Sequence, residues 1–330
     1  MTRDGTGPWI RTVTLLVGLI ILLPIVAIAD DEVLYDVDGY IGAELLLEIR
    51  SLPEGFGEIS RPLDVATDST GRIIVLDNND RVLFFDSNGQ FLKTFGARGR
   101  RPGEFRDANA LTVDKTDRIF VADSGNNRVQ VFDPEGNYLF EFGEKPPRRG
   151  APQPGQLARA ISIGISPDDY VYVVDIDSHR VHVFNLEGQF QYTFGELGTR
   201  DGQLNYPVGI GFDADGYIYV VNALNFRIEV FSPEGEFDAK FGRAGDTKGC
   251  FSRPKTIAAD SQGNLYVTDS MLNLIQILDY EGEYLGRIGG HAAIPLFAQP
   301  FGIWIDAADR LYVADRGNNR IMVFNLLELE

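Results

Sequence analysis

Side chains that could act as nucleophiles or zinc ligands are few and scattered along the chain. The 330-residue sequence holds one cysteine, Cys250, and three histidines, His179, His182 and His291. A zinc site needs several ligands that converge on one point, and three scattered imidazoles do not predict one. Cys250 follows the polar segment 245–249, where a neighbouring cation can lower the pKa of a thiol. We interpret this single exposed thiol as incidental.

Positive charge is concentrated in two segments that are rich in Arg, Pro and Gly, residues 97–107 and 144–158. Guanidinium groups bind carboxylates and phosphates through paired hydrogen bonds. We therefore expect these segments to contact an acidic ligand, although they could equally be solvated connectors in which nearby carboxylates offset the cations. The residues expected to bind are Arg98, Arg100, Arg101, Phe105, Lys145, Arg148, Arg149, Lys255 and Phe301.

A tandem array carries these segments. Six units align, and an acidic or amide residue recurs at the same place in each of them. Self-similarity at such a period indicates a repeat architecture. The recurring residues, which are 46, 52, 47, 47 and 46 positions apart, are Asp77, Asp123, Asp175, Asn222, Asp269 and Asp315.

Each unit predicts four short β-strands. Runs of β-branched and aromatic residues, such as 73–76 and 82–85, alternate with turns that place glycine where a hairpin needs a positive φ, as at 87–89. Four-stranded units arranged radially form a propeller, in which each sheet is buried between its two neighbours. We predict an all-β, six-bladed β-propeller over residues 30–330.

The two ends of the propeller are predicted to meet in one blade. The last unit stops after residues 323–325 and lacks its fourth strand, whereas residues 38–49 carry the missing hairpin-and-strand pattern. We expect this N-terminal strand to complete the sixth blade. The closure removes a free sheet edge, which would otherwise promote aggregation.

The units resemble NHL repeats. The matching features are an opening Arg-Pro or its counterpart, Ile-Tyr-Val-x-Asp in the second strand, Gly-Asn-Asn-Arg after it and a closing Phe-Gly, with the best matches at 123–128 and 315–320. The resemblance covers residues 38–330 and implies the fold, but NHL propellers include RNA-binding, protein-binding, sensor and lyase members. We interpret the recurring Asp and Arg as structural, because both can satisfy backbone groups of the turn between them.

The amidating lyase of this family uses histidines just after the proline that opens the inner strand, and this sequence departs from that pattern. The equivalent positions offer no metal ligand, so we predict no catalytic residue and no cofactor. Calcium binding at the channel mouth remains an alternative, with Asp64 as the one candidate carboxylate ligand at that level. The equivalent positions are Leu63, Asn109, Ile161, Val208, Lys255 and Phe301.

The first thirty residues predict export. Arg3 and Arg11 precede an apolar run over residues 12–29, which ends in Ala-Ile-Ala before an acidic stretch. This pattern is typical of a signal peptide, and the run of 18 residues is also at the short limit for a membrane anchor. We predict that residues 1–29 are a signal peptide or an N-terminal membrane anchor. The propeller is then extracytoplasmic, either secreted, periplasmic or held at the membrane by residues 12–29.

The charge pattern favours a binding function. The net charge of −18 argues against nucleic acid or an anionic membrane as the main partner. Basic inter-blade loops and acidic opposite hairpins predict a disc with a mixed-to-basic top and an acidic bottom. We predict an exported, non-enzymatic binding or scaffold propeller that recognises a protein, peptide or anionic glycan through the inter-blade loop face. The alternative is a divalent-metal-dependent lyase or hydrolase at the mouth of the central channel, and RNA binding ranks third.

Overall fold

The computed structural model describes residues 41–144, 147, 153–290 and 296–328. The chain divides into two compact units, residues 1–31 and 32–330, and all described residues belong to the second. The predicted leader, residues 1–29, lies outside the described residues, as do Lys145, Arg148, Arg149 and His291. Among the described residues, no helix is long and apolar enough to cross a membrane.

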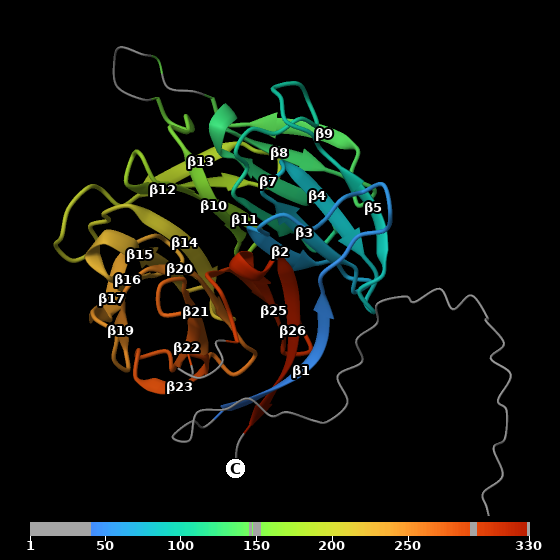
Figure 1. The fold of residues 1–330 in the computed structure, drawn as a ribbon. Helices are drawn as coiled ribbons and strands as arrows, with labels where there is room; N and C mark the ends of the chain where they lie inside the picture. Colours follow the sequence, from blue (N-terminus) through green and yellow to red (C-terminus); the bar gives the residue numbers. More distant parts are fainter. Residues whose placement is uncertain (1–40, 145–146, 148–152, 291–295, 329–330) are drawn as a thin grey trace, which may run out of the picture. The chain divides into compact units, whose positions relative to one another are not determined.

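Six four-stranded antiparallel sheets surround a central channel, as predicted (Figure 1). The innermost strand of each sheet contacts the innermost strands of both neighbouring sheets, so the blades form a closed ring. Five blades use consecutive strands, which are β2 (Asp64–Thr67), β3 (Ile73–Asp77), β4 (Arg81–Phe85) and β5 (Phe91–Phe95); β6 (Ala110–Val113), β7 (Ile119–Asp123), β8 (Arg128–Phe132) and β9 (Tyr138–Phe142); β10 (Ala160–Ile165), β11 (Tyr170–Asp175), β12 (Arg180–Asn185) and β13 (Phe190–Phe194); β14 (Pro207–Phe212), β15 (Ile218–Asn222), β16 (Arg227–Phe231) and β17 (Phe237–Phe241); β20 (Pro254–Ala259), β21 (Leu265–Asp269), β22 (Leu274–Leu278) and β23 (Tyr284–Gly289).

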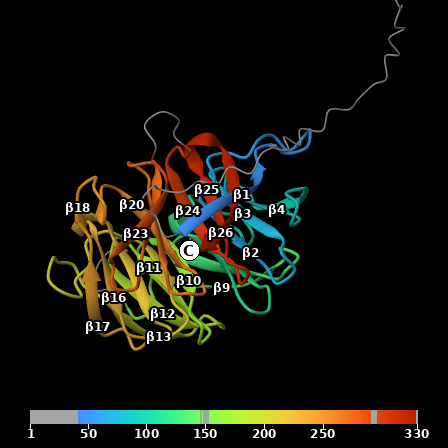
Figure 2. The ribbon, with the colours of Figure 1, turned by 90° about the horizontal axis from the view of Figure 1, so that it is seen from below.

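The sixth blade contains both ends of the described chain. Its sheet order is β1 (Ile41–Ile49), β26 (Arg320–Glu328), β25 (Arg310–Asp315) and β24 (Pro300–Ile305), with β1 antiparallel to β26 (Figures 1 and 2). The prediction of N-terminal closure is therefore confirmed. On β1, Glu48 accepts a hydrogen bond from Arg320 at 3.0 Å, just as Glu141 on β9 accepts one from Arg128 at 2.7 Å in blade 2.

The core lies between blades. Second strands such as β3 and β7 are buried along their whole length, because each sheet packs against a neighbour on both faces. At the closing junction, Val75 and Leu83 of blade 1 pack in one cluster with Tyr312 and Val323 of blade 6. Closure of the ring therefore buries side chains that are more than 200 positions apart in the sequence.

The recurring Asp or Asn fixes each inter-blade loop to its blade. In all six blades its side chain accepts a hydrogen bond from the backbone N–H of the residue 17 positions earlier. In blade 2, Asp123 also accepts hydrogen bonds from Asn126, Arg128 and Gln130 at 2.8 to 3.1 Å. These contacts agree with a structural interpretation of the Asp-Arg pattern.

Blade 4 achieves the same connection with a different distribution of charge. Asn222 replaces the aspartate, and the buried carboxylate belongs to Glu229, which lies seven residues further on. Glu229 pairs with Arg227 and accepts a hydrogen bond from the Asn222 amide at 3.2 Å. One buried carboxylate is thus present in either arrangement.

Candidate functional site

The inter-blade loops and the turns between second and third strands share one face of the ring, which we call the top face. In each blade, the residue after the Pro or Ala that opens the inner strand lies at the top end of that strand, and we call these six residues the mouth ring. Four are apolar, one carries an amide and one carries an ammonium group. The mouth ring comprises Leu63, Asn109, Ile161, Val208, Lys255 and Phe301.

Two cations lie against one aromatic ring at this mouth. The Lys255 ammonium nitrogen is 5.3 Å from the centroid of the Phe301 ring, and the Arg316 guanidinium carbon is 5.2 Å from the same centroid. Both distances are within the range of cation–π attraction. Lys255 comes from β20 in blade 5, whereas Phe301 on β24 and Arg316 in the turn η3 (Arg316–Asn318) come from blade 6.

No ion pair compensates the positive charge of this cluster within the described residues, although the Asp269 carboxylate attracts Lys255 and opposes the lowering of its pKa. Lys255, Arg316 and the exposed Arg61 and Arg253 form no ion pair there, and the Nε of Arg316 is buried without a hydrogen-bond partner. Burial is the largest cause that lowers the pKa of Lys255, and the charges of Arg253 and Arg316 lower it further. The pKa of Arg316 is likewise lowered, mainly by burial and then by the charge of Arg61. An anion bound here would therefore stabilise both charged forms.

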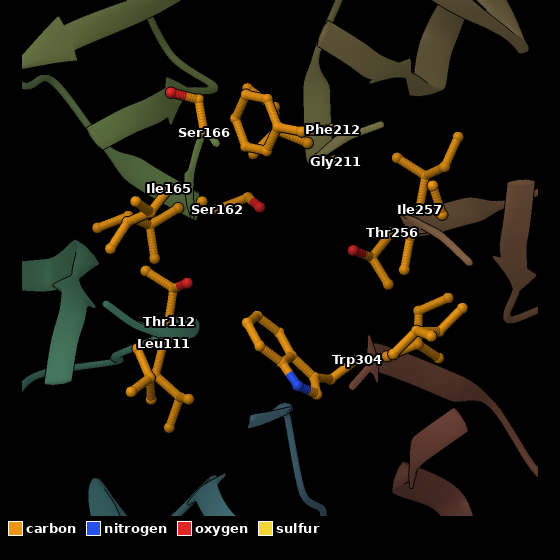
Figure 3. Close-up of a pocket in the computed structure, with 18 of the residues that line it drawn as sticks. Leu111, Thr112, Ser162, Ile165, Ser166, Gly211, Phe212, Thr256, Ile257 and Trp304 are labelled. Atoms are coloured by element: carbon orange, nitrogen blue, oxygen red, sulfur yellow. The ribbon is translucent and has the colours of Figure 1, made fainter. Parts of the chain in front are cut away.

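Below the mouth the channel holds a cavity of about 310 Å³. Its wall combines aliphatic side chains with hydroxyl groups, and Figure 3 shows Ser162 and Thr256 with their hydroxyls directed into the open centre. Trp304 also lines the cavity and donates a hydrogen bond from its indole N–H to the Thr67 hydroxyl at 3.0 Å. The lining also holds charged groups, most of them acidic, in contrast to the cationic mouth. They are Asp64, Asp114, Lys115, Asp169 and Asp213.

Asp64 follows the mouth-ring residue Leu63 in the sequence and lines the cavity. Its two oxygens accept backbone hydrogen bonds from Val65 and Leu111, each at 3.0 Å. Burial is the largest influence and raises the pKa of Asp64 from 3.8 to about 7. Gly302 approaches so closely that a Cβ there would lie 2.2 Å from an Asp64 oxygen, so no larger residue fits beside this carboxylate.

Asp64 predicts a pH dependence of stability. Because the pKa is raised in the folded state, the contribution of the protonated carboxyl is complete below about pH 4 and is lost as the pH rises through about 7. We expect the free energy of unfolding to fall across this window by at most about 1.4 kcal/mol per pH unit. Asp64→Asn should lack this decrease. Urea unfolding of both proteins at pH 5, 6, 7 and 8 measures it, and parallel profiles would contradict the assignment.

The residues that could bind a metal do not gather in the described part of the chain. No three His, Cys, Asp or Glu side chains converge there. His179 accepts a hydrogen bond from the Tyr206 backbone at 3.1 Å, and His182 is buried near Asp175 within blade 3. Cys250, which we expected to be exposed, is buried beneath the loop that enters blade 5, with its sulfur 3.2 Å from the Thr247 hydroxyl.

The structure separates the predicted binding residues into two groups. Arg98, Arg100 and Arg101 are exposed on the loop between blades 1 and 2, and within the described chain no hydrogen bond or ion pair joins them to Lys255 or the Phe301 ring. Arg98 instead faces Asp107 at 3.5 Å. The structure thus brings Lys255 and Phe301 together and leaves the three arginines on a separate rim loop.

The expectation that Phe105 contacts a partner is wrong. Its side chain is fully buried and packs against Phe95 and Phe132, with ring centroids 6.1 and 5.6 Å apart. Every inter-blade loop buries an apolar residue at the same position, 18 residues before the recurring Asp or Asn. These loop anchors are Ile59, Phe105, Leu157, Leu204, Phe251 and Phe297.

Sequence comparisons identify the repeat architecture over part of the chain. Residues 58–143 match a family model described as a 6-bladed beta-propeller. A stretch of 47 residues is 34% identical to the protein brain tumor of Drosophila melanogaster. The matched stretch covers 14% of this chain and 4% of that protein. The chain therefore spans a small part of the length of this curated relative.

Solved structures resemble the chain over most of its length. A virginiamycin B lyase from Staphylococcus aureus matches with a TM-score of 0.59 and 15% identity, over 88% of this chain and 89% of the lyase. A gluconolactonase from Xanthomonas campestris matches with a TM-score of 0.63 and 16% identity, over 90% of this chain and 95% of that chain. At such low identity these likenesses show the fold alone, a six-bladed β-propeller.

Proposed function

We propose that this protein is an exported, non-enzymatic binding propeller of the NHL class that recognises an anionic group on a protein or peptide at the top mouth of its channel. The observation that carries the proposal is the placement of Lys255 and Arg316 against the Phe301 ring, where neither cation forms an ion pair with a described residue. Export rests on the signal-like residues 1–29, and the NHL assignment rests on the repeat motifs.

Physical chemistry favours a bound anion at this position. Like charges that are held together and partly desolvated destabilise one another, and in this cluster the pKa of each of the two cations is lowered. A carboxylate placed between them would gain charge-assisted hydrogen bonds, which are about twice as strong as neutral ones. The aromatic ring below offers apolar contact to whatever carries the anion.

A metal-dependent enzyme receives less support. The lyase and gluconolactonase likenesses concern the fold. Four carboxylates line the cavity, but no three His, Cys, Asp or Glu side chains converge within the described residues. Hydrolysis or elimination needs an acid–base set within hydrogen-bond reach of the reacting atoms. Calcium bound at Asp64 would have to complete its shell of six to eight oxygens from backbone, hydroxyl and water ligands.

Charge reversal at the mouth tests the proposal. Lys255→Glu/Arg316→Glu is expected to weaken binding of a dye-labelled acidic peptide, acetyl-(Glu)₆-amide, by at least about 100-fold, which corresponds to about 2.8 kcal/mol. The matched control Arg98→Glu/Arg100→Glu changes the net charge equally but alters the rim loop. It should retain affinity within about threefold, because exposed charges contribute little. Fluorescence anisotropy at fixed ionic strength measures both, and thermal unfolding verifies that the variants are folded.

Other results of this binding experiment would change where the anion site is placed or whether it exists. Loss of binding in the rim variant alone would move the site to residues 97–107. Equal loss in both variants would indicate a general effect of net charge, and absence of binding by the unaltered protein would contradict the proposed function.

A further inference from the structure

The top of blades 4 and 5 departs from the polar pattern of the other blades. In the turn between second and third strands, the second residue is Asn79, Gly125, Asp177 or Gly317 in four blades. In blades 4 and 5 the same position holds Leu224 and Met271. Adjacent blades therefore present large apolar side chains where the others present polar groups or glycine.

A second replacement lies at the left-handed residue of the same turn. In four other blades this residue accepts a hydrogen bond from the loop that enters the next blade, as Asn319 does from the Arg61 N–H at 2.8 Å. Blade 4 has Phe226 there, with φ of 53°. A phenyl ring cannot accept that hydrogen bond, and the left-handed conformation is unfavourable for a bulky residue. The aromatic ring is thus present in spite of a cost to local stability.

Hydrogen bonds place the turn of blade 4 beside two other exposed apolar residues. Leu224 donates its N–H to the carbonyl next to Tyr206, at 3.1 Å, and Asn225 donates to the carbonyl next to Leu197, at 2.8 Å. We call Leu197, Tyr206, Leu224 and Met271 the apolar patch. Their exposed fractions are 61%, 46%, 51% and 55%, whereas most large apolar side chains of the described chain are buried.

The apolar patch adjoins the cationic mouth. The buried Asp269 carboxylate accepts hydrogen bonds from both the Met271 and the Arg253 backbone N–H, at 3.0 Å and 2.9 Å, so these two residues are neighbours. Arg253 in turn lies close enough to Lys255 to lower its pKa. Apolar and positively charged groups therefore follow one another across the top of blades 4, 5 and 6.

We propose that this surface binds an extended acidic segment of a partner protein whose carboxylates alternate with large apolar side chains. The inference rests on the proposed function and names the partner of that site. Aliphatic side chains and a methionine favour an apolar side chain as occupant, because methionine adapts its shape to a partner, and the adjacent cations supply the complementary charge. A nucleic acid would use the cations and leave Leu197, Leu224 and Met271 without apolar contacts.

Two probes of equal charge separate the apolar contribution from the ionic one. The first is dye-labelled acetyl-Glu-Leu-Glu-Glu-Leu-Glu-amide, and the second has serine in place of both leucines. The unaltered protein is expected to bind the leucine peptide at least about tenfold more tightly. Leu224→Ser/Met271→Ser should reduce this preference to about onefold and leave the affinity for the serine peptide unchanged. The control Leu92→Ser/Leu139→Ser alters similarly exposed residues on outer strands and should keep the preference.

The outcomes distinguish this inference from the proposed function. Equal affinity for both peptides, lost in Lys255→Glu/Arg316→Glu, would retain the anion site and overturn the apolar patch as a docking surface. Failure of both peptides to bind would contradict the proposed function itself. Tighter binding of an oligodeoxythymidylate of equal charge, insensitive to Leu224→Ser/Met271→Ser, would overturn the peptide in favour of nucleic acid.

Discussion

Asp123→Asn is expected to lower the free energy of unfolding by about 3 kcal/mol. The carboxylate is fully buried and accepts hydrogen bonds from the Arg106 backbone and from the side chains of Arg128 and Gln130. Loss of one member of a buried ion pair leaves the other charge uncompensated. The loss stays at the lower end of the usual range because Arg128 keeps its second partner, Glu141, at 2.7 Å.

Blade 4 shows which second substitution should restore stability. There Asn222 is accompanied by Glu229, and blade 2 has Gln130 at the position equivalent to Glu229. Asp123→Asn/Gln130→Glu recreates the blade 4 arrangement in blade 2. We expect the double variant to recover at least half of the stability that Asp123→Asn loses.

Urea unfolding of the unaltered protein, both single variants and the double variant measures the coupling. Gln130→Glu alone should destabilise the fold, because it would place a second carboxylate within hydrogen-bond distance of the buried Asp123. The favourable coupling energy is expected to be about 2 kcal/mol. Additive effects would show that the two positions act independently and that blade 4 is stabilised in another way.

A chain that begins at residue 51 is expected not to fold, whereas one that begins at residue 38 should unfold as cooperatively as the full chain. Strand β1 contributes the buried Ala43 and Ile49, and its Glu48 pairs with Arg320. Without it, β26 becomes an unpaired edge and the core between blades 6 and 1 is opened. The loss is comparable with the whole stability of a domain, about 5–15 kcal/mol.

Thermal unfolding followed by circular dichroism, together with gel filtration, measures this effect. A synthetic peptide of residues 38–50, added to the chain that begins at residue 51, should restore a cooperative transition by strand addition. A peptide of the same composition in scrambled order is the control. An unchanged midpoint in the shortened chain would show that closure of the ring contributes little to stability.

The fold could be predicted from the sequence because the same pattern of strands and turns recurs in six units. One irregular unit, such as blade 4 with Asn222 or blade 5 with Leu274 in place of the usual Asp or Arg, does not obscure a spacing that the others repeat. The missing strand of the last unit and the extra strand near the N-terminus are complementary in the same way. Periodicity therefore determines which strands exist and which of them pair.

The candidate site could be predicted only in part, because repetition does not say which residues of different blades meet. Arg316 and Lys255 are 61 positions apart in different blades, and both reach Phe301. The turn between the second and third strands did contain a sequence signal for Arg316. At the first position after the recurring Asp or Asn, Arg316 is the one charged residue among Asn78, Ser124, Ile176, Ala223, Ser270 and Arg316.

The misplacement of Phe105 has a similar origin. Most of its neighbours in residues 97–107 are arginines, glycines and a proline, and an aromatic residue among them suggests a binding surface. Alignment of the loops, rather than of the strands, shows an apolar residue at that position in every unit. A position that is apolar in all six loops belongs to the packing between blades, because no ligand requires six copies of it.

The order of synthesis gives the closing blade a further role. Strand β1 is made near the beginning of the chain, and Arg320, which pairs with its Glu48, is made 272 residues later. During that interval β1 has no sheet to join, and the growing array has one unfinished side. A product that stops short of β26 keeps unpaired strand edges, which make an incomplete chain prone to aggregation. The last blade thus distinguishes finished molecules from interrupted ones.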